Sequence, residues 1–139
     1  MDREELKTFM PHREPMLLLD EASIDENGVA HCSYRIREDE FFTRGHFPGK
    51  PLVPGVILCE IMAQSCAVLV REAIPGNITL YGGLDKVRFK QPVKPGDLCE
   101  VSATLSERRG KIFFCSAKLE VDGKLAAKGE LSFVLVPKE

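Results

Sequence analysis

The sequence has no strong charge of either sign and no long apolar run. Its net charge is −2, and acidic and basic residues are interspersed, so no overall field attracts nucleic acid. No stretch reaches about 18 apolar residues without a charge, so we expect no membrane-spanning segment. The N-terminus, MDREELKTFM, lacks the apolar core of a secretory signal. These absences predict a cytoplasmic protein that binds neither nucleic acid nor membrane.

The cysteines also lack the spacing of a functional cluster. There are five of them, an odd number, and they form no CxxC motif or Cys/His group with zinc geometry. Most lie within apolar patterns and are typical of small core residues in a reducing compartment. We therefore expect no metal site.

The 139 residues contain no repeat, low-complexity segment or linker, and we expect a single domain over 1–139. Residues 3–10 suggest a short helix. Residues 16–24 and 29–37 predict two strands around a turn at Asn27-Gly28. A loop rich in aromatic residues, proline and glycine follows through residues 38–54.

The run from Val56 to about Glu72 is the one long helical candidate. It is apolar almost all round, so it should be a buried central helix that ends before Pro75-Gly76. The remaining chain predicts strands over 78–90, 98–106 and 111–121, of which the last two alternate apolar and polar residues, and a last strand follows the turn at Asp122-Gly123.

The resulting fold class is α+β, with about five or six mostly antiparallel strands wrapped around one helix. A sheet of this length, only half covered by its own chain, suggests partner subunits.

Glu60 lies in the middle of this apolar helix, and Gln64 follows one turn later on the same stripe. A buried carboxylate without a partner is costly, and its pKa usually rises in response. We therefore expect Glu60 to be protonated near neutral pH, as a general acid must be. The alternative is that Glu60 and Gln64 meet water or pair with a cation such as Lys50 or Arg88.

His46 precedes the helix in HFPGKPLVPG, residues 46–55, where three prolines fix the backbone and remove amide donors. Such a stiff segment holds a side chain at little entropic cost, and imidazole suits proton transfer near pH 7. A structural loop histidine is the alternative. His12, beside Pro11, and His31, within a strand pattern, are expected to be structural.

Gly55 opens the helix, where the first amides have no internal acceptor and the dipole is partially positive. Without a Cβ, it lets a carbonyl oxygen approach its N–H and be polarised toward an enolate, although a tight helix entry also needs glycine. A base, a buried acid and a helix N-terminus indicate proton abstraction next to a carbonyl, as in loss of water from a 3-hydroxyacyl group. The stiff leader keeps His46 from Glu60 within one chain, which indicates a dimer.

The stretch HFPGKPLVPGVILCEIMAQ, residues 46–64, closely resembles the signature of bacterial (3R)-hydroxyacyl-acyl-carrier-protein dehydratases of type II fatty acid synthesis. Related dehydratase/isomerases carry Asp at the acidic position, so Glu60 favours the plain dehydratase. Four further blocks resemble the family in the same order: PHREPMLLLD (11–20), FFTRGHFPG (41–49), GGLDKVRFKQPVKPGD (82–97) and VDGK (121–124).

The resemblance implies a hotdog fold, which is a curled antiparallel sheet wrapped around one long central helix. It implies an active site shared across a homodimer, in which His46 of one subunit takes the α-proton, directly or through a water. Glu60 of the other subunit would protonate or orient the departing 3-hydroxyl, and the Gly55 amide would hold the thioester carbonyl. No metal or organic cofactor is expected, and the family commonly assembles as trimers of dimers.

Other side chains are assigned by position. Three residues besides Gly55 are predicted to bind substrate: Phe47, Val56 and Gln64. Four apolar residues are candidates for the acyl channel or for plain core: Phe47, Ile57, Met62 and Phe89. Two basic groups either dock an acidic acyl-carrier protein or are solvated strand ends and a charged turn: Arg88, Lys90 and Lys94, and Arg108, Arg109 and Lys111.

Two other functions compete with the dehydratase. A hotdog thioesterase also uses a helix carboxylate beside a polarised thioester, but thioesterases generally lack a histidine with the spacing of His46. A non-catalytic acyl-thioester sensor on the same fold should not need both His46 and Glu60. Such sensors usually carry a DNA-binding extension, which the 139 residues do not contain.

Overall fold

An antiparallel sheet forms the body of this protein, whose computed structural model describes residues 1–138. Glu139, the last residue of the expected 1–139 domain, lies outside the described residues. The sheet has six antiparallel strands in the order β1-β2-β4-β5-β6-β3. The strands are β1 (Glu21–Ile24), β2 (Ala30–Arg35), β3 (Asn77–Phe89), β4 (Leu98–Arg109), β5 (Ile112–Val121) and β6 (Lys124–Pro137).

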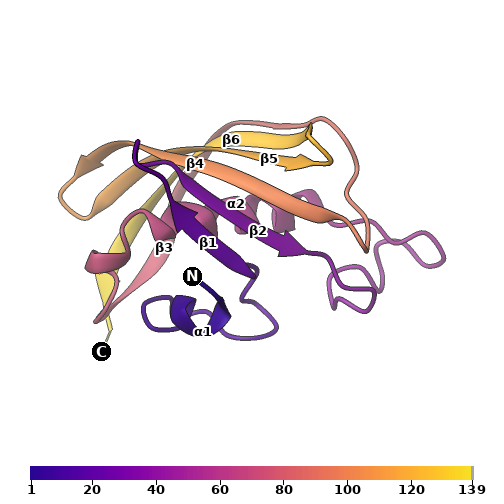
Figure 1. The fold of residues 1–139 in the computed structure, drawn as a ribbon, viewed down its shortest axis with the longest axis horizontal. Helices are drawn as coiled ribbons and strands as arrows, with labels where there is room; N and C mark the ends of the chain where they lie inside the picture. The colour runs from indigo at the N-terminus through magenta and orange to yellow at the C-terminus, as the bar shows by residue number, and fades with distance from the viewer. Residues whose placement is uncertain (139) are drawn as a thin grey trace.

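The sheet curls around one central helix, α2 (Gly55–Val68), and the short α1 (Arg3–Leu6) lies below them (Figure 1). In β5 the buried residues alternate from Phe113 to Leu119, as the sequence pattern predicts. At the β5–β6 turn both Asp122 and Gly123 have positive φ, 52° and 77°, which is the geometry of a tight hairpin. The α+β prediction and the curled antiparallel sheet are confirmed.

The central helix is shorter than predicted, because it ends at Val68 and not near Glu72. The amides of Leu69 and Val70 bond to carbonyls three residues back, so the helix tightens and gives way to a 3-10 turn, η1 (Arg71–Ala73). Most of α2 is buried, although Val56 in its first turn is 74% exposed.

The N-terminal segment differs from prediction in a way that matters for the site. The helix expected over 3–10 ends at Leu6, and the strand expected over 16–24 begins only at Glu21. Leu17, Leu18 and Leu19 are buried without strand pairing. The Leu18 amide instead donates to a side chain of α2, which removes it from any ladder.

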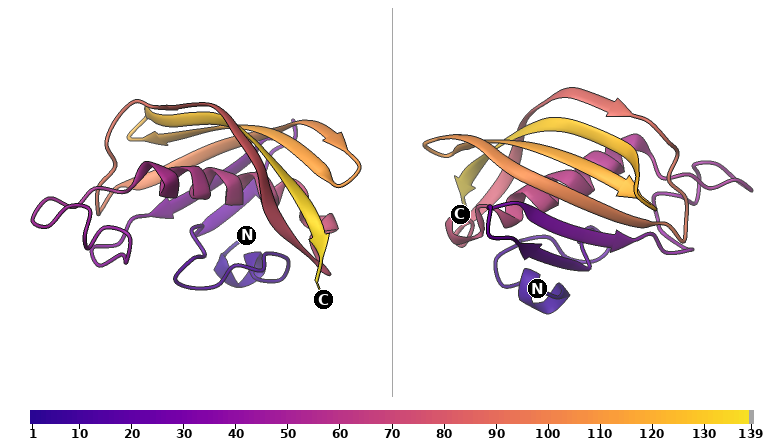
Figure 2. Two further views of the ribbon diagram at one scale, coloured as in Figure 1. Left: turned by 180° about the vertical axis from the view of Figure 1, so that it is seen from behind. Right: turned by 45° about the horizontal axis from the view of Figure 1, so that its top comes forward.

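Two features lie at the ends of the molecule. The 38–54 loop projects beyond the first turn of α2 (Figure 2), and its Val53 amide donates to the Val93 carbonyl at 2.8 Å. Strand β3 is a sheet edge and pairs only with β6.

In the part of the chain that the structure describes, no helix is long and apolar enough to cross a membrane.

Candidate active site

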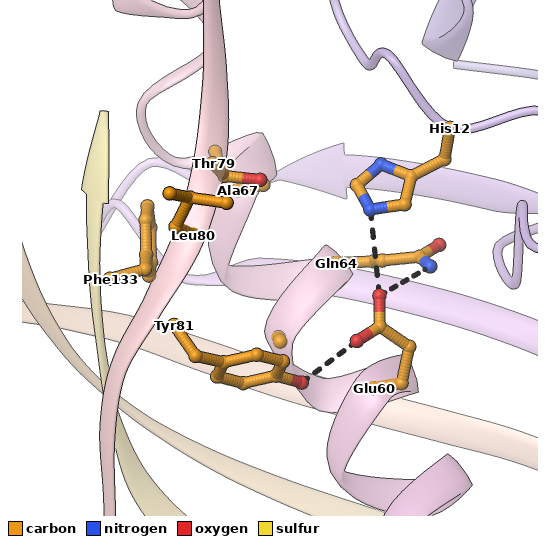
Figure 3. A pocket seen from close by; sticks show the side chains of 9 residues that line it. His12, Glu60, Gln64, Ala67, Thr79, Leu80, Tyr81 and Phe133 are labelled. Atoms are coloured by element: carbon orange, nitrogen blue, oxygen red, sulfur yellow. Dashed lines mark hydrogen bonds and ion pairs between the residues drawn. The ribbon is translucent and has the colours of Figure 1, made fainter. Parts of the chain in front are cut away.

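Glu60 is the centre of a hydrogen-bonded cluster on α2, and its side chain is only 18% exposed. Three groups converge on its carboxyl (Figure 3). The Tyr81 hydroxyl donates to Oε1 at 2.9 Å, and the Gln64 amide donates to Oε2 at 2.9 Å. His12 Nε2 lies 3.5 Å from the same Oε2. The carboxyl is therefore buried but well supplied with donors.

These contacts overturn the expectation that Glu60 is held neutral by its helix. Burial raises the pKa of Glu60, but the hydrogen bonds from His12, Gln64 and Tyr81 outweigh burial and lower the pKa below its ordinary value. The expectation was wrong because it counted only the apolar residues of the helix itself. Of the suggested partners, neither Lys50 nor Arg88 forms an ion pair with Glu60, and His12 takes that place.

Gln64 is predicted to bind substrate, but its polar atoms are already used inside the protein. The residue is 1% exposed. Its Oε1 accepts from the Leu18 amide at 2.8 Å, and its Nε2 donates to the Met16 carbonyl at 2.8 Å and to Glu60. The structure therefore places Gln64 between the N-terminal segment and the carboxyl, where it fixes both.

His12 and Tyr81 are the two site residues that sequence reasoning missed. His12 was expected to be structural because its sequence neighbour is Pro11, yet the irregular N-terminal segment carries its ring to Glu60. Its Nδ1 is buried and has no hydrogen-bond partner among residues 1–138. Tyr81 lies on β3, and only the pairing of that strand beside α2 brings it to Glu60. It immediately precedes the block GGLDKVRFKQPVKPGD (82–97), so no quoted motif contained it.

A cavity of about 230 Å³ opens beside this cluster. Glu60, His12 and Tyr81 form its polar end, and the helix face continues past them with Ala63 and Ala67, whose small side chains leave space. Gln64 also lines the cavity, and the other lining residues come from β3 and β6: Thr79, Leu80 and Phe133 (Figure 3). The cavity therefore has a polar end at Glu60 and mainly apolar walls beyond it, as ligand sites commonly have.

The residues predicted for the acyl channel do not line this cavity. Met62 is fully buried core, and Ile57 packs against the core. In this single chain Phe47 is 53% exposed and Phe89 is 52% exposed. Val56, which is predicted to bind substrate, is exposed too. Periodicity could not identify the lining, because four of its nine residues come from the pairing of β3 with β6.

His46 lies on the 38–54 loop, outside the cavity that holds Glu60. Its amide donates to the Thr43 carbonyl at 3.1 Å, and its own carbonyl accepts from the Leu52 amide at 2.6 Å. The ring stacks on Phe47, with the centroids 4.3 Å apart. Its Nδ1 is 3.2 Å from the Leu52 carbonyl oxygen, and since a carbonyl only accepts, Nδ1 carries the proton. The neutral ring then has its free lone pair on Nε2.

Gly55 begins α2 after Pro54, which provides no side-chain cap, and the first turn has no acidic residue. Within residues 1–138 the amides of Gly55 and Val56 have no acceptor, whereas those of Ile57 and Leu58 bond to the Pro54 carbonyl. A Cβ on Gly55 would lie 2.9 Å from Cζ of Phe89, so the ring of Phe89 packs directly on this glycine. Close packing therefore requires glycine here as well.

A profile of the FabA-like domain matches residues 10–130. The chain belongs to the FabA-like family. It is 46% identical over 138 residues to the 3-hydroxyacyl-[acyl-carrier-protein] dehydratase FabZ of Streptococcus pyogenes serotype M5 (strain Manfredo), which covers 96% of this chain and 97% of the relative. The enzyme of the same name from Streptococcus pneumoniae (strain CGSP14) is 42% identical, over 97% and 98% of the two chains.

Solved structures show the same fold at low sequence identity. The dehydratase heterocomplex ApeI:P from Xenorhabdus doucetiae matches with a TM-score of 0.80 and 18% identity over 96% of this chain and 91% of that one. A putative thioesterase from Ralstonia eutropha matches with a TM-score of 0.67 and 21% identity over 94% and 96%. The hotdog fold that the resemblance implies is thus confirmed, as is the resemblance to the dehydratases.

In this member of the FabA-like family, the cysteine thiols and His31 take no part in the hydrogen bonds to Glu60. All five cysteines are buried and unpaired, and burial raises the pKa of Cys32 to about 11 and that of Cys99 to about 12. His31 pairs with Asp25 at 2.8 Å on the exposed β1–β2 hairpin, in agreement with a structural role. No three His, Cys, Asp or Glu side chains of the described residues are grouped as metal ligands.

The donors around Glu60 predict how acid affects stability. Because the folded-state pKa of Glu60 lies below the ordinary value of 4.5, its ionised form stabilises the fold above that pH, and the stabilisation is lost as the pH falls through the folded-state pKa. In Glu60→Gln the group cannot titrate. We expect the free energy of unfolding, measured with urea, to fall more steeply for the unmodified protein than for Glu60→Gln between about pH 5 and about pH 3. Equal slopes would contradict the lowered pKa.

Proposed function

We propose that this protein is a hydro-lyase that dehydrates (3R)-hydroxyacyl-acyl-carrier-protein to trans-2-enoyl-acyl-carrier-protein in fatty acid biosynthesis. The observation that carries the proposal is the 46% identity to a curated dehydratase of this type over nearly all of both chains. The geometry supports it, because a carboxylate lies at the polar end of an apolar cavity. No step of the reaction needs a metal or an organic cofactor.

His46 is the proposed base. The hydrogen bond from Nδ1 to the Leu52 carbonyl leaves Nε2 free to take the α-proton of the acyl chain, directly or through a water. The same bond stabilises the imidazolium that forms. The thioester carbonyl is held by the Gly55 amide, whose lack of an acceptor and place at the start of α2 favour the negative charge of an enolate.

Glu60 is proposed to orient the 3-hydroxyl as an ionised carboxylate. Its hydrogen-bond donors favour the ionised form, so it accepts a hydrogen bond from the hydroxyl better than it supplies a proton. The C3–O bond breaks as the electron pair of the α C–H bond forms the new double bond. The proton on His46 then passes to the departing oxygen, which leaves as water. Each turnover returns His46 to neutrality and leaves Glu60 ionised.

The site is proposed to be completed by a second copy of the chain, so that His46 of one subunit faces Glu60 of the other. Within one chain His46 does not line the cavity of Glu60. The edge strand β3 offers a contact surface, because it pairs on one side only and exposes several large apolar side chains. Those side chains are Leu80, Tyr81, Leu84 and Phe89. We propose a homodimer, and a trimer of such dimers as the larger assembly.

An acidic acyl-carrier protein is the proposed carrier of the substrate, in the cytoplasm. Of the two basic groups, Arg88, Lys90 and Lys94 are the better placed, because they follow or flank Phe89, whose ring lies on Gly55. None of the three forms an ion pair within residues 1–138. In the other group, at the β4–β5 turn, Arg109 pairs with Glu107, and Arg108 lies over the Phe113 ring at 4.7 Å.

The decisive assay incubates the protein with a 3-hydroxyacyl thioester on acyl-carrier protein and measures the enoyl product. We expect turnover, and we expect His46→Ala and Glu60→Gln each to lower kcat by about 10²–10⁴-fold, with unchanged circular dichroism. Free thiol in place of enoyl product would instead show a thioesterase, and binding without turnover a sensor. Near-native turnover in either variant would contradict the roles given to these residues.

Mixing the two inactive variants tests the shared site. When His46→Ala and Glu60→Gln chains are co-expressed with different tags, half of the dimers contain one of each, and one of the two sites in such a dimer is intact. We therefore expect about a quarter of the unmodified activity to return. A site formed within one chain would give no recovery, because every chain then carries a defect.

The docking surface predicts a defect that depends on the carrier. Lys90→Glu should raise KM for substrate on acyl-carrier protein by about tenfold, because it repels an acidic partner, while KM for the same acyl group on a small thiol mimic stays unchanged. Lys111→Glu, from the other basic group, is the matched control and should leave both KM values unchanged. An equal effect of the two substitutions would rule out this choice of surface.

A further inference from the structure

The two carboxyl oxygens of Glu60 differ in the number of polar groups that contact them. Oε2 has two neighbours, the Gln64 amide at 2.9 Å and His12 Nε2 at 3.5 Å. Oε1 has one, the Tyr81 hydroxyl at 2.9 Å. A carboxylate offers about two acceptor positions on each oxygen, so the open position is on Oε1. This is the oxygen that is free to accept a hydrogen bond from a substrate hydroxyl.

An irregularity in β3 directly follows Tyr81. The register with β6 runs regularly to the pair Tyr81 and Phe133 and then shifts at Gly82-Gly83. Such bulges change the direction of a strand and of its side chains. A Cβ on Gly82 would lie 3.2 Å from Oγ of Ser132, so the two strands approach closely there.

A second contact ties the phenol to α2. The Tyr81 oxygen lies 3.4 Å from the Cys59 carbonyl as well as 2.9 Å from Glu60 Oε1. One hydroxyl on β3 therefore meets two successive residues of the helix. Tyr81 also lines the cavity, so its hydroxyl lies at the polar end where the substrate hydroxyl is expected.

We propose that Tyr81 is a positioning residue for Glu60, whose hydroxyl orients the carboxyl so that Oε1 faces the 3-hydroxyl of the substrate. The inference rests on the proposed dehydratase function. Gln64 anchors the other oxygen through the N-terminal segment, so the carboxyl is held from both sides and cannot rotate away. Phenylalanine at this position would fill the same space but leave Oε1 without its donor.

Four titratable groups from the surrounding elements act on this carboxyl or on the phenol beside it. They are His12 from the N-terminal segment, Tyr81 from β3, and Cys59 and Cys66 on α2. Burial and the charge of Glu60 raise the pKa of the Tyr81 phenol, so it remains a donor at all working pH values. Its removal should make Glu60 easier to protonate.

The test is Tyr81→Phe, read in two ways. We expect kcat to fall by about tenfold, equivalent to the loss of one hydrogen bond to a charged group, with KM within about twofold. We also expect the pKa of the Glu60 carboxyl, followed by carbon NMR, to rise by about one unit. Unchanged kcat together with an unchanged Glu60 titration would overturn the proposal. The titration tests the contact even if the protein does not dehydrate, so the two proposals fail separately.

Tyr34→Phe is the matched control. Tyr34 is the other tyrosine of the chain, and its hydroxyl donates to buried Glu40 at 2.6 Å, a similar pair that does not line the cavity. It should leave the Glu60 titration unchanged even if stability falls. A shift of the Glu60 pKa in this variant equal to that in Tyr81→Phe would also overturn the proposal.

Discussion

The hydrogen bonds to Glu60 connect three parts of the chain that are far apart in sequence. Gln64 joins α2 to the backbone of Met16 and Leu18, and Tyr81 joins it to β3. A carboxylate inside an apolar helix is tolerated only with such donors. The unusual conformation of the N-terminal segment, which is buried without strand pairing, is therefore best understood as part of what the carboxyl requires.

The cavity depends on the same arrangement. Once Glu60 is fixed at one end, the small residues Ala63 and Ala67 continue along the helix and leave a volume that β3 and β6 close. The polar end thus comes from side chains that hold the carboxyl, and the apolar end from side chains that are too small to fill the space. One face of α2 therefore both orients the carboxyl and leaves room for an acyl chain.

The strands and the central helix could be predicted from sequence because their information is local. Alternation identified β5 and the Asp122-Gly123 turn, and the apolar run identified α2, although not its early end at Val68. Glu60 was identified as the one carboxylate among residues 55–68, which form that helix. The direction of its pKa shift could not be predicted, because the donors lie on segments whose pairing with α2 has no local signal.

Contacts between distant segments also explain why the roles of the other site residues could not be predicted. His12 looked structural beside Pro11, and Tyr81 looked like an ordinary strand residue, since each becomes significant only through a contact across the fold. Gln64 was found by its helical spacing from Glu60, but spacing alone could not show that its amide is already fully bonded. A sequence pattern identifies which side chains share a face of a helix or strand. It does not identify the residues from other segments that they contact.

Because His46 lies outside the cavity of its own chain, the concentration of the protein should control its activity. Under the proposed shared site, a folded single chain contains both reactive groups and yet holds no complete active site. Activity per chain then follows mass action and falls on dilution as dimers dissociate. A cell that makes little of this protein would lose activity faster than it loses protein, and assembly would act as the threshold for catalysis.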